Sequence, residues 1–226
     1  MQLKTWIAAA LAAATCSVNA QNVLDNGSFE TAGPGFVEFE SWANFGNVFT
    51  ADEGEIVAQD GSFTAKMFGA SSGAQSDQVL TQNVAATAGV SYTLSGYCQN
   101  KSSDALGDEN VILMQMVFRD SGGNGLLTVE TDAIDTASDP FDTWVYSSVD
   151  AIAPAGTTNI DVFLLHIQLG ADQGFPTQGG GASFWDNIVL SGGDAPCTNP
   201  ADLNGDGELN FFDVSLFITE FSNGCP

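Results

Sequence analysis

Residues 159–169 read NIDVFLLHIQL, a run that carries apolar side chains at both odd and even positions. Side chains of a β-strand alternate between the two faces of a sheet, so the run divides into two sets. One set is Phe163, Leu165, Ile167 and Leu169, and the other is Val162, Leu164, His166 and Gln168. The wholly apolar set predicts a face packed in a core. The second set predicts a face that is neither core nor ordinary solvated surface.

Two further runs divide in the same way. In residues 91–99, SYTLSGYCQ, the apolar face is Tyr92, Leu94, Gly96 and Cys98, opposite Thr93, Ser95, Tyr97 and Gln99. In residues 110–120, NVILMQMVFRD, the apolar face is Ile112, Met114, Met116 and Phe118, opposite Val111, Leu113, Gln115, Val117 and Arg119. The mixed faces of such strands suit sugars, because aromatic rings stack on pyranose faces while amide, Arg and His groups hydrogen-bond hydroxyls.

The rest of the chain favours an all-β fold. Strands are predicted at residues 63–69, 78–84, 91–99, 110–120, 143–150, 159–169 and 182–190. Turns such as DSGGNG (residues 120–125) separate them, and the sequence between them holds no convincing amphipathic helix. Aromatic residues make up 10% and charged residues 14% of the chain, which suits an all-β domain with polar, uncharged surfaces. A length of 226 residues allows one such domain and a small appendage.

The beginning of the chain has the form of an export signal. Lys4 precedes the apolar run WIAAALAAA, and the small-residue site VNA ends at Ala20, so the mature protein is expected to begin at Gln21. A lipoprotein signal would use Cys16, but Thr15 stands where Gly or Ala is expected. The apolar run is too short to span a bilayer, which takes about 20 residues. We therefore expect a secreted protein, extracellular or at the cell surface, with no membrane span.

The charge balance excludes two classes of partner. The formal net charge is −24, and removal of the signal leaves Lys66, Lys101 and Arg119 against 28 acidic residues. Nucleic acid and anionic lipid would both be repelled, because their binding rests on Lys and Arg.

Residues 202–213, DLNGDGELNFFD, have the spacing of a calcium loop. Calcium takes six to eight oxygen ligands, and the loop supplies them at positions one, three, five, seven, nine and twelve, with glycine at six. Gly207 fills position six. The expected ligands are Asp202, Asn204, Asp206, Glu208 through its carbonyl, Asn210 and Asp213.

This tail resembles the dockerin module of secreted bacterial polysaccharide-degrading systems, since its helix starts inside the loop and Asp213 replaces the usual Glu. Dockerins of that kind carry the unit twice in tandem. Here it occurs once, bracketed by Cys197 and Cys225, and looks like the single-repeat anchors of exported planctomycete-type proteins. The resemblance implies that the helix at 211–221 docks onto a protein receptor. The helix carries two apolar stripes, Phe211, Val214, Ile218, Phe221 and Phe212, Leu216, Phe217. One stripe can cover the loop, and the other is left to pack on the sandwich or on that receptor.

The cysteines fit the same division of the chain. An unpaired thiol is uncommon in an exported protein, so Cys197 and Cys225 are expected to form a disulfide around the calcium module. Cys98, on the apolar face of its strand, is then expected to be a free, buried thiol.

Five segments carry a second resemblance: NVLDNGSFE (22–30), SWANFG (41–46), VAATAGVSYTLSGYCQN (84–100), TWVYSSVDAIAPAGTTNIDVFLL (143–165) and GGGASFWDNIVL (179–190). In this order they resemble the β-sandwich carbohydrate-binding modules of families four, nine, sixteen and twenty-two. The resemblance implies a jelly-roll, galactose-binding-domain-like sandwich of two antiparallel sheets without catalysis. It implies a concave sheet that binds a β-glucan or xylan, and a structural calcium held by Glu30 and Asp186.

The sugar contacts expected on this basis are Tyr97, Gln99, Gln115, Arg119, His166, Gln168 and Trp185. Several of these have structural alternatives. His166 is the only histidine, and a lone histidine is more often structural than a ligand. Trp185 is expected to point away from the side that bears Phe184, Ile188 and Leu190, as a stacking platform, although core packing is an alternative. Trp42 and Trp144 stand where the resembled modules have core tryptophans, so core packing is expected for both. Glu30 and Asp186 are alternatively plain surface acids.

The predicted organisation is a signal at 1–20, a sandwich at 21–191, a linker at 192–196 and the calcium tail at 197–226. The function it favours is a secreted polysaccharide-binding protein tethered by its tail. A structural or adhesive protein without a sugar site is the alternative. A small hydrolase or lyase using paired acids such as Glu38 and Glu40 is a third reading.

Overall fold

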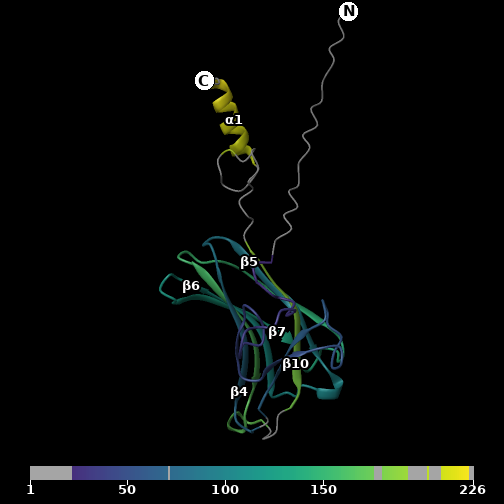
Figure 1. Ribbon diagram of the computed structural model, residues 1–226. Coiled ribbons are helices and arrows are strands. Elements are labelled where there is room, and N and C mark those ends of the chain that lie inside the picture. Colours follow the sequence, from purple (N-terminus) through teal and green to yellow (C-terminus); the bar gives the residue numbers. More distant parts are fainter. Residues whose placement is uncertain (1–21, 71, 176–179, 193–202, 204–209, 224–226) are drawn as a thin grey trace, which may run out of the picture.

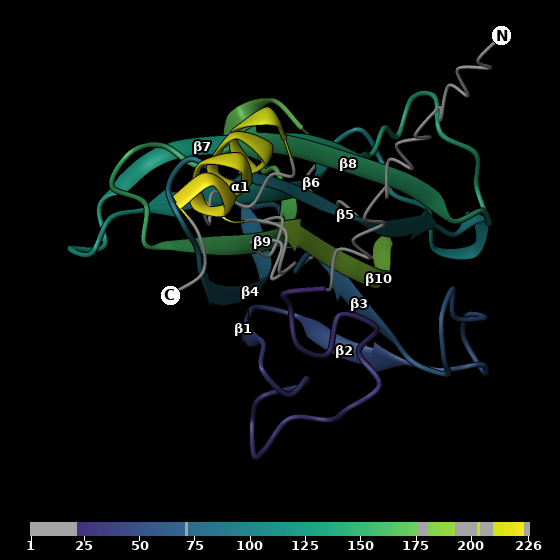
Figure 2. The ribbon, with the colours of Figure 1, turned by 90° about the horizontal axis from the view of Figure 1, so that it is seen from above.

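The computed structural model describes residues 22–70, 72–175, 180–192, 203 and 210–223. Two antiparallel sheets, each of five strands, stack face to face around the core (Figure 1, Figure 2). The all-β sandwich predicted from the alternating sequence pattern is thus confirmed for the main body of the chain.

The first sheet, the β9 sheet, consists in spatial order of β1 (Ala43–Phe45), β4 (Ser76–Ala85), β9 (Asn159–Gln168), β6 (Asn110–Arg119) and β7 (Gly125–Ile134). The second, the β10 sheet, consists of β2 (Val48–Ala51), β3 (Thr64–Phe68), β10 (Ala182–Gly192), β5 (Ser91–Asn100) and β8 (Val145–Ile152). The remaining elements are the 3₁₀ turns η1 (Ser102–Asp104) and η2 (Ala171–Gln173) and the helix α1 (Phe211–Asn223). Each sheet therefore combines strands from both halves of the chain.

The predicted strands are all present, with boundaries correct to within two residues. Three strands were missing from the prediction. β1 and β2 are edge strands of three and four residues, too short for a periodic signal. β7 does alternate, with Leu127 and Val129 packed toward the core and Thr128 and Glu130 exposed, but its many polar residues conceal the pattern.

Aromatic side chains from the N-terminal segment fill one part of the core. Phe29, Phe39 and Trp42 are almost fully buried, and their rings pack against one another with centroids 4.9–5.6 Å apart. Trp42 also donates its indole N–H to the carbonyls of Asp25 and Asn26. The expectation that Trp42 is a core residue is confirmed, and residues outside the strands complete the sandwich.

The phase of β9 is the opposite of the predicted one. Val162, Leu164, His166 and Gln168 are buried on the core side, whereas Phe163, Leu165 and Ile167 are half-buried on the outer side. Because both faces of this strand carry apolar residues, alternation alone does not decide which one faces inward. The face with His166 turns inward because Ser183 on β10 and Asn110 on β6 provide hydrogen-bond partners for the imidazole inside the sandwich.

Helix α1 confirms the helix predicted in the tail, and begins at Phe211. Asn210 caps it, since its Oδ1 accepts the N–H of Phe212 at 2.7 Å. Within the described ranges no helix is both long and apolar enough to cross a membrane. The predicted export signal, the segment 193–196 of the linker, Cys197 and Cys225 lie outside the described residues. Cys98 is described, and it is free and buried as expected.

Candidate functional site

The side of the β9 sheet that faces away from the core forms a continuous surface across five strands. Strand register sets its side chains in rows, because residues paired across antiparallel strands point to the same face. One row is Phe45, Val79, Leu165, Leu113 and Asp132, and the next is Ala43, Thr81, Phe163, Gln115 and Glu130. A third row is Asn83, Asp161, Val117 and Thr128. We call this surface the β9 face.

An apolar stripe runs through the middle of the β9 face. Phe45 at the edge is 68% exposed, while Val79, Leu165, Leu113 and Phe163 are half-buried by one another. Contiguous apolar surface of this kind marks an interaction site more often than scattered apolar residues do. The stripe is therefore a candidate contact area for a ligand, because it lies on the outer side of the sheet and is not part of the core.

Hydrogen-bonding side chains border the stripe on the rows beside it. Gln115 on β6 donates its amide to Oε2 of Glu130 on β7 at 2.7 Å. That bond fixes the orientation of the Gln115 amide, and the other carboxylate and amide oxygens of the pair still face solvent. The pair can therefore donate to and accept from hydroxyl groups beside an apolar strip.

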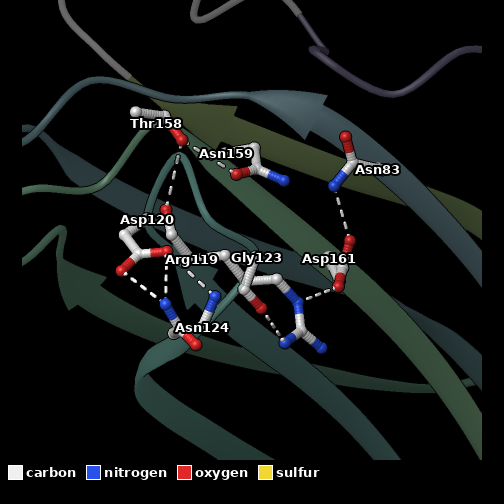
Figure 3. Close-up of polar contacts among 8 residues, drawn as sticks. All are labelled: Asn83, Arg119, Asp120, Gly123, Asn124, Thr158, Asn159 and Asp161. Atoms are coloured by element: carbon white, nitrogen blue, oxygen red, sulfur yellow. Dashed lines mark hydrogen bonds and ion pairs between the residues drawn. The ribbon is translucent and has the colours of Figure 1, made fainter.

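A polar network closes one end of the face, as Figure 3 shows. Asp161 on β9 lies between two neighbours: Arg119 on β6 forms an ion pair with it through Nε, and Asn83 on β4 donates its amide to Oδ1. The guanidinium also donates from Nη1 to the carbonyl of Gly123 at 3.1 Å. Three neighbouring strands thus contribute one group each, namely the Arg119 guanidinium, the Asp161 carboxylate and the Asn83 amide, and these contacts fix their geometry.

The turn that receives Arg119 is itself rigid. Asp120 Oδ1 accepts the backbone N–H groups of Gly122 and Asn124, both at 2.9 Å, and the Asn124 amide as well. These hydrogen bonds lower the pKa of the Asp120 carboxyl from its ordinary value, and the bond from the Asn124 side chain has the largest effect. The carbonyl of Gly123 is thereby held where the guanidinium reaches it.

The predicted sugar contacts lie in three different environments. Gln115 and Arg119 belong to the β9 face, so the structure brings these two together. Tyr97 and Gln99 point outward from β5 in the other sheet, on the opposite side of the molecule. His166, Gln168 and Trp185 lie inside the sandwich with 0%, 3% and 0% exposure. The expectation of a single mixed surface shared by all of them is therefore wrong.

His166 is a structural residue of the interior. Its Nδ1 lies 3.0 Å from Ser183 Oγ on β10, and its Nε2 lies 3.0 Å from Asn110 Oδ1 on β6. Burial lowers its pKa to about 4, although a backbone bond to Met67 opposes the shift. The imidazole is therefore neutral at ordinary pH and serves to satisfy buried polar atoms rather than to meet a ligand.

Trp185 is also a core residue, contrary to its predicted orientation. Its indole N–H donates to Ser183 Oγ at 2.9 Å. A register shift between Asp186 and Val189, with Asn187 at φ 49°, changes the phase of β10. As a result Trp185, Ile188 and Leu190 all join the core, whereas strict alternation sets Trp185 opposite the other two.

The outer side of the β10 sheet is more crowded. Tyr97 packs edge-on against Tyr146 of β8, with centroids 5.3 Å apart, and Gln99 is 7% exposed. Phe184 is fully buried there and packs in a cluster with buried Ile56 and partly buried Phe68 and Trp144. The loop between β2 and β3 supplies part of this cover, because Trp144 donates its indole N–H to the carbonyl of Val57.

The predicted calcium ligands Glu30 and Asp186 hold the same loop. Asp186 Oδ2 accepts the N–H groups of Gln59 and Asp60 at 2.8 and 2.9 Å, and Glu30 Oε1 accepts those of Ser62 and Phe63 at 2.8 Å. Burial raises the pKa of Asp186 to about 6 despite these bonds. Two carboxylates that converge on one loop suit a hard cation, although among the described residues no three acidic, His or Cys side chains cluster.

In the tail, the structure describes Asn210 and Asp213 but not Asp202, Asn204, Asp206 or Glu208. The carboxylate of Asp213 is buried and accepts the N–H groups of Leu203 at 3.0 Å and Asn210 at 2.8 Å. The residue at position twelve thus contacts backbone at positions two and nine. An acidic group at the closing point of the loop fits the predicted calcium module.

Sequence reasoning missed several residues of the β9 face, namely Phe45, Val79, Thr81, Asn83, Asp161, Phe163 and Leu165. Asp161 lies on the same side of the strand as Phe163 and Leu165. This acidic residue in the run at 159–169 therefore indicates which side of the strand faces outward. Phe45 lies in a strand too short to be recognised.

No protein-family model matches the chain. No curated protein matches it either. Among solved structures, the enzymatically active domain of tailspike protein 4 of bacteriophage CBA120 aligns with 75% of the chain at 15% identity and a TM-score of 0.52. The arabinose-bound α-L-arabinofuranosidase MgGH51 aligns with 76% of it at 15% identity and a TM-score of 0.50. The chain spans 21% and 26% of the lengths of these two proteins.

A third similar structure is TmCBM61 in complex with β-1,4-galactotriose, which aligns with 75% of the chain and 97% of its own length. The identity is 18% and the TM-score 0.48. The likeness to the tailspike domain and to the arabinofuranosidase, at 15% identity, shows a similar fold alone, so the binding chemistry must be argued from the residues of this chain.

Proposed function

We propose that this protein is a secreted, non-catalytic carbohydrate-binding protein that binds a β-glucan or xylan-type polysaccharide on the β9 face. The observation that carries the proposal is the apolar stripe from Phe45 to Leu113, bordered by Gln115, Glu130 and the Arg119 network. Sugars present apolar C–H faces beside hydroxyl groups, and this surface offers contacts of both kinds.

The dimensions of the surface favour a chain over a single sugar. Strands in a sheet lie about 4.8 Å apart, so the five strands make a face roughly 19 Å wide. Two of the three rows run across all five strands. An extended oligosaccharide can lie along a row and contact several strands at once.

The tail is proposed to tether this binding domain. Calcium would be held by Asp202, Asn204, Asp206, Glu208, Asn210 and Asp213, with Cys197 and Cys225 joined around it, and a separate calcium by Glu30 and Asp186. The helix α1 exposes Phe211, Phe212, Val214, Phe217 and Ile218, each more than 50% accessible. A protein receptor that covers these side chains would give the tail its function.

A structural or adhesive role is the second candidate, because an apolar helix face serves a tether whether or not the sandwich binds sugar. The hydrolase reading finds less support. Glu38 Oε1 accepts both the N–H and the hydroxyl of Thr50 at 2.7 Å, while Glu40 is exposed and buried Phe39 lies between them. The Glu38 carboxylate is thus engaged with Thr50.

Depletion of the protein from solution by insoluble xylan and β-glucan tests the proposal. Retention on one of these polysaccharides, competed by its soluble oligosaccharide, supports sugar binding. Retention on none of them, together with failure to bind across a broad glycan array, contradicts it and favours the adhesive role. Release of reducing sugar would instead indicate catalysis.

A further inference from the structure

A small cavity opens on the side of the β10 sheet, away from the β9 face. Its volume is about 240 Å³, and its walls are Lys66, Phe68, Gly69, Asp104, Gly180 and Gly181. Lys66 and Phe68 come from the outer side of β3 and Asp104 from η1, while Gly69 follows β3 and Gly180 and Gly181 precede β10. Nothing in the sequence analysis pointed to these residues as a site.

Aromatic rings form one side of the cavity. Phe68 stacks on Phe49 with centroids 5.5 Å apart and planes inclined by 13°, and Phe49 is 46% exposed. The ammonium of Lys66 lies 5.6 Å from the Phe68 centroid and 5.4 Å from that of buried Phe184. These cation–π contacts hold the lysine against the rings, so the ammonium and the Phe68 ring line the cavity side by side.

The charges around the cavity are balanced. Lys66 forms an ion pair with Glu55 and lies 3.7 Å from Asp104 Oδ2, and only 17% of its side chain is exposed. The side chain of Asp104 is 47% exposed. An anion would meet Asp104 and Glu55, and a cation would meet Lys66. A neutral ligand that both accepts and donates hydrogen bonds meets no repulsion.

The glycine walls are held in place, and at Gly69 and Gly181 there is no room for a side chain. The Asn110 amide donates to the carbonyl of Gly180 at 2.9 Å, and the N–H of Gly180 donates to Glu109 Oε1 at 3.1 Å. Gly181 has φ +95°, and a Cβ there would lie 2.3 Å from the carbonyl oxygen of Ala105. A Cβ on Gly69 would lie 1.7 Å from Gln168 Oε1. Buried groups therefore hold the cavity in one shape before any ligand arrives.

We propose that this cavity is a second sugar site, which binds the single terminal pyranose unit of a neutral glycan. C–H groups of the sugar would contact Phe68, hydroxyls would donate to Asp104, and Lys66 and backbone groups would donate to hydroxyl or ring oxygens. The volume lies below the roughly 300–1,000 Å³ of pockets for drug-sized ligands, which suits one ring rather than a chain. The site stands on its own residues and does not depend on polysaccharide binding at the β9 face.

The full-length protein and a panel of free monosaccharides test this site. Saturation-transfer difference NMR with D-glucose, D-galactose, D-xylose and L-arabinose, each at millimolar concentration, should show transfer to at least one sugar. Asp104→Asn keeps the shape of the side chain but removes its charge, and is expected to weaken that sugar about tenfold. Gly180→Leu should abolish the transfer, because no atom lies within 4 Å of a Cβ built at Gly180 and the side chain has room to enter the cavity.

A variant on the other sheet separates the two sites. Phe45→Ala should leave monosaccharide transfer unchanged, and Gly180→Leu should leave retention on polysaccharide unchanged. The proposal is overturned if no sugar shows transfer, if transfer survives both Asp104→Asn and Gly180→Leu, or if Phe45→Ala alone removes it. If the NMR spectrum of Gly180→Leu differs from that of the wild type because the variant is misfolded, the effect of Asp104→Asn on the transfer alone tests the proposal.

Discussion

His166 Nδ1 on β9 and Ser183 Oγ on β10 lie 3.0 Å apart, so a hydrogen bond joins the two sheets through the interior. Trp185 donates to Ser183 Oγ, which leaves the hydroxyl proton for His166 Nδ1. Asn110 donates its amide to the carbonyl of Gly180, so its Oδ1 accepts from Nε2–H. The neutral Nε2–H tautomer of His166 fits both of these contacts.

Acid should break this chain. The folded pKa of His166 is lowered to about 4, below the ordinary value of about 6.5. The unfolded chain thus binds the proton first, and stability falls as pH drops from about 6.5 to about 4. By linkage the fold loses roughly 2–3 kcal/mol from this group between pH 7 and 4.5. Urea unfolding of the wild type and of His166→Gln at both pH values measures this contribution. It is the loss of unfolding free energy in the wild type minus the loss in the variant.

Equal losses of stability in the two proteins would contradict the assignment of His166. Other carboxyl groups titrate in the same range, but they are common to both proteins and cancel in the comparison.

Trp185→Phe distinguishes a core tryptophan from a sugar platform. The change removes the indole N–H that Ser183 accepts and leaves a small void, so we expect the free energy of unfolding to fall by about 2–3 kcal/mol. Affinity for polysaccharide should not change. A folded Trp185→Phe protein that has lost polysaccharide binding would restore the sequence-based prediction for this residue.

The Arg119–Asp161 pair should contribute modestly to stability. Its side chains are 28% and 18% exposed, so a coupling energy of about 1 kcal/mol is expected from a double-mutant cycle with Arg119→Ala and Asp161→Ala. Raising the salt concentration should reduce it. A coupling near zero at low salt would show that the guanidinium holds no fixed place on the β9 face.

Calcium titration by calorimetry should detect two separable events in the full-length protein. Glu30→Gln should remove the event of the sandwich, and Asp213→Asn that of the tail, because each change removes a charged oxygen ligand. Asp150→Asn, an exposed acid of β8, is the matched control and should leave both. A single event that neither variant alters would refute both proposed metal sites.

The sequence is sufficient for the fold because strands with one clear apolar face have only one way to pack. β5 and β6 show this, since Leu94, Cys98, Met114 and Met116 are all buried as expected. The all-β sandwich with antiparallel sheets follows from such strands.

The candidate site is harder to predict, because it depends on which face of a two-sided apolar strand turns outward. In β9, His166 and Gln168 looked like ligand contacts, yet buried partners from β6 and β10 draw the histidine inside. In β10, the register shift after Asp186 places Trp185 on the core side together with Ile188 and Leu190. Strand pairing, which single-strand alternation does not contain, decides both.

Retention of Phe45→Ala and Ile152→Ala on the bound polysaccharide tests the central claim most directly. Both side chains are about two-thirds exposed, at 68% and 66%, and they lie on opposite sheets. Phe45→Ala, combined with Gln115→Ala, should weaken binding by about tenfold or more, on the scale of one to two lost contacts. Ile152→Ala should match the wild type. Full retention of the Phe45/Gln115 double variant, or equal loss with Ile152→Ala, would contradict binding at the β9 face.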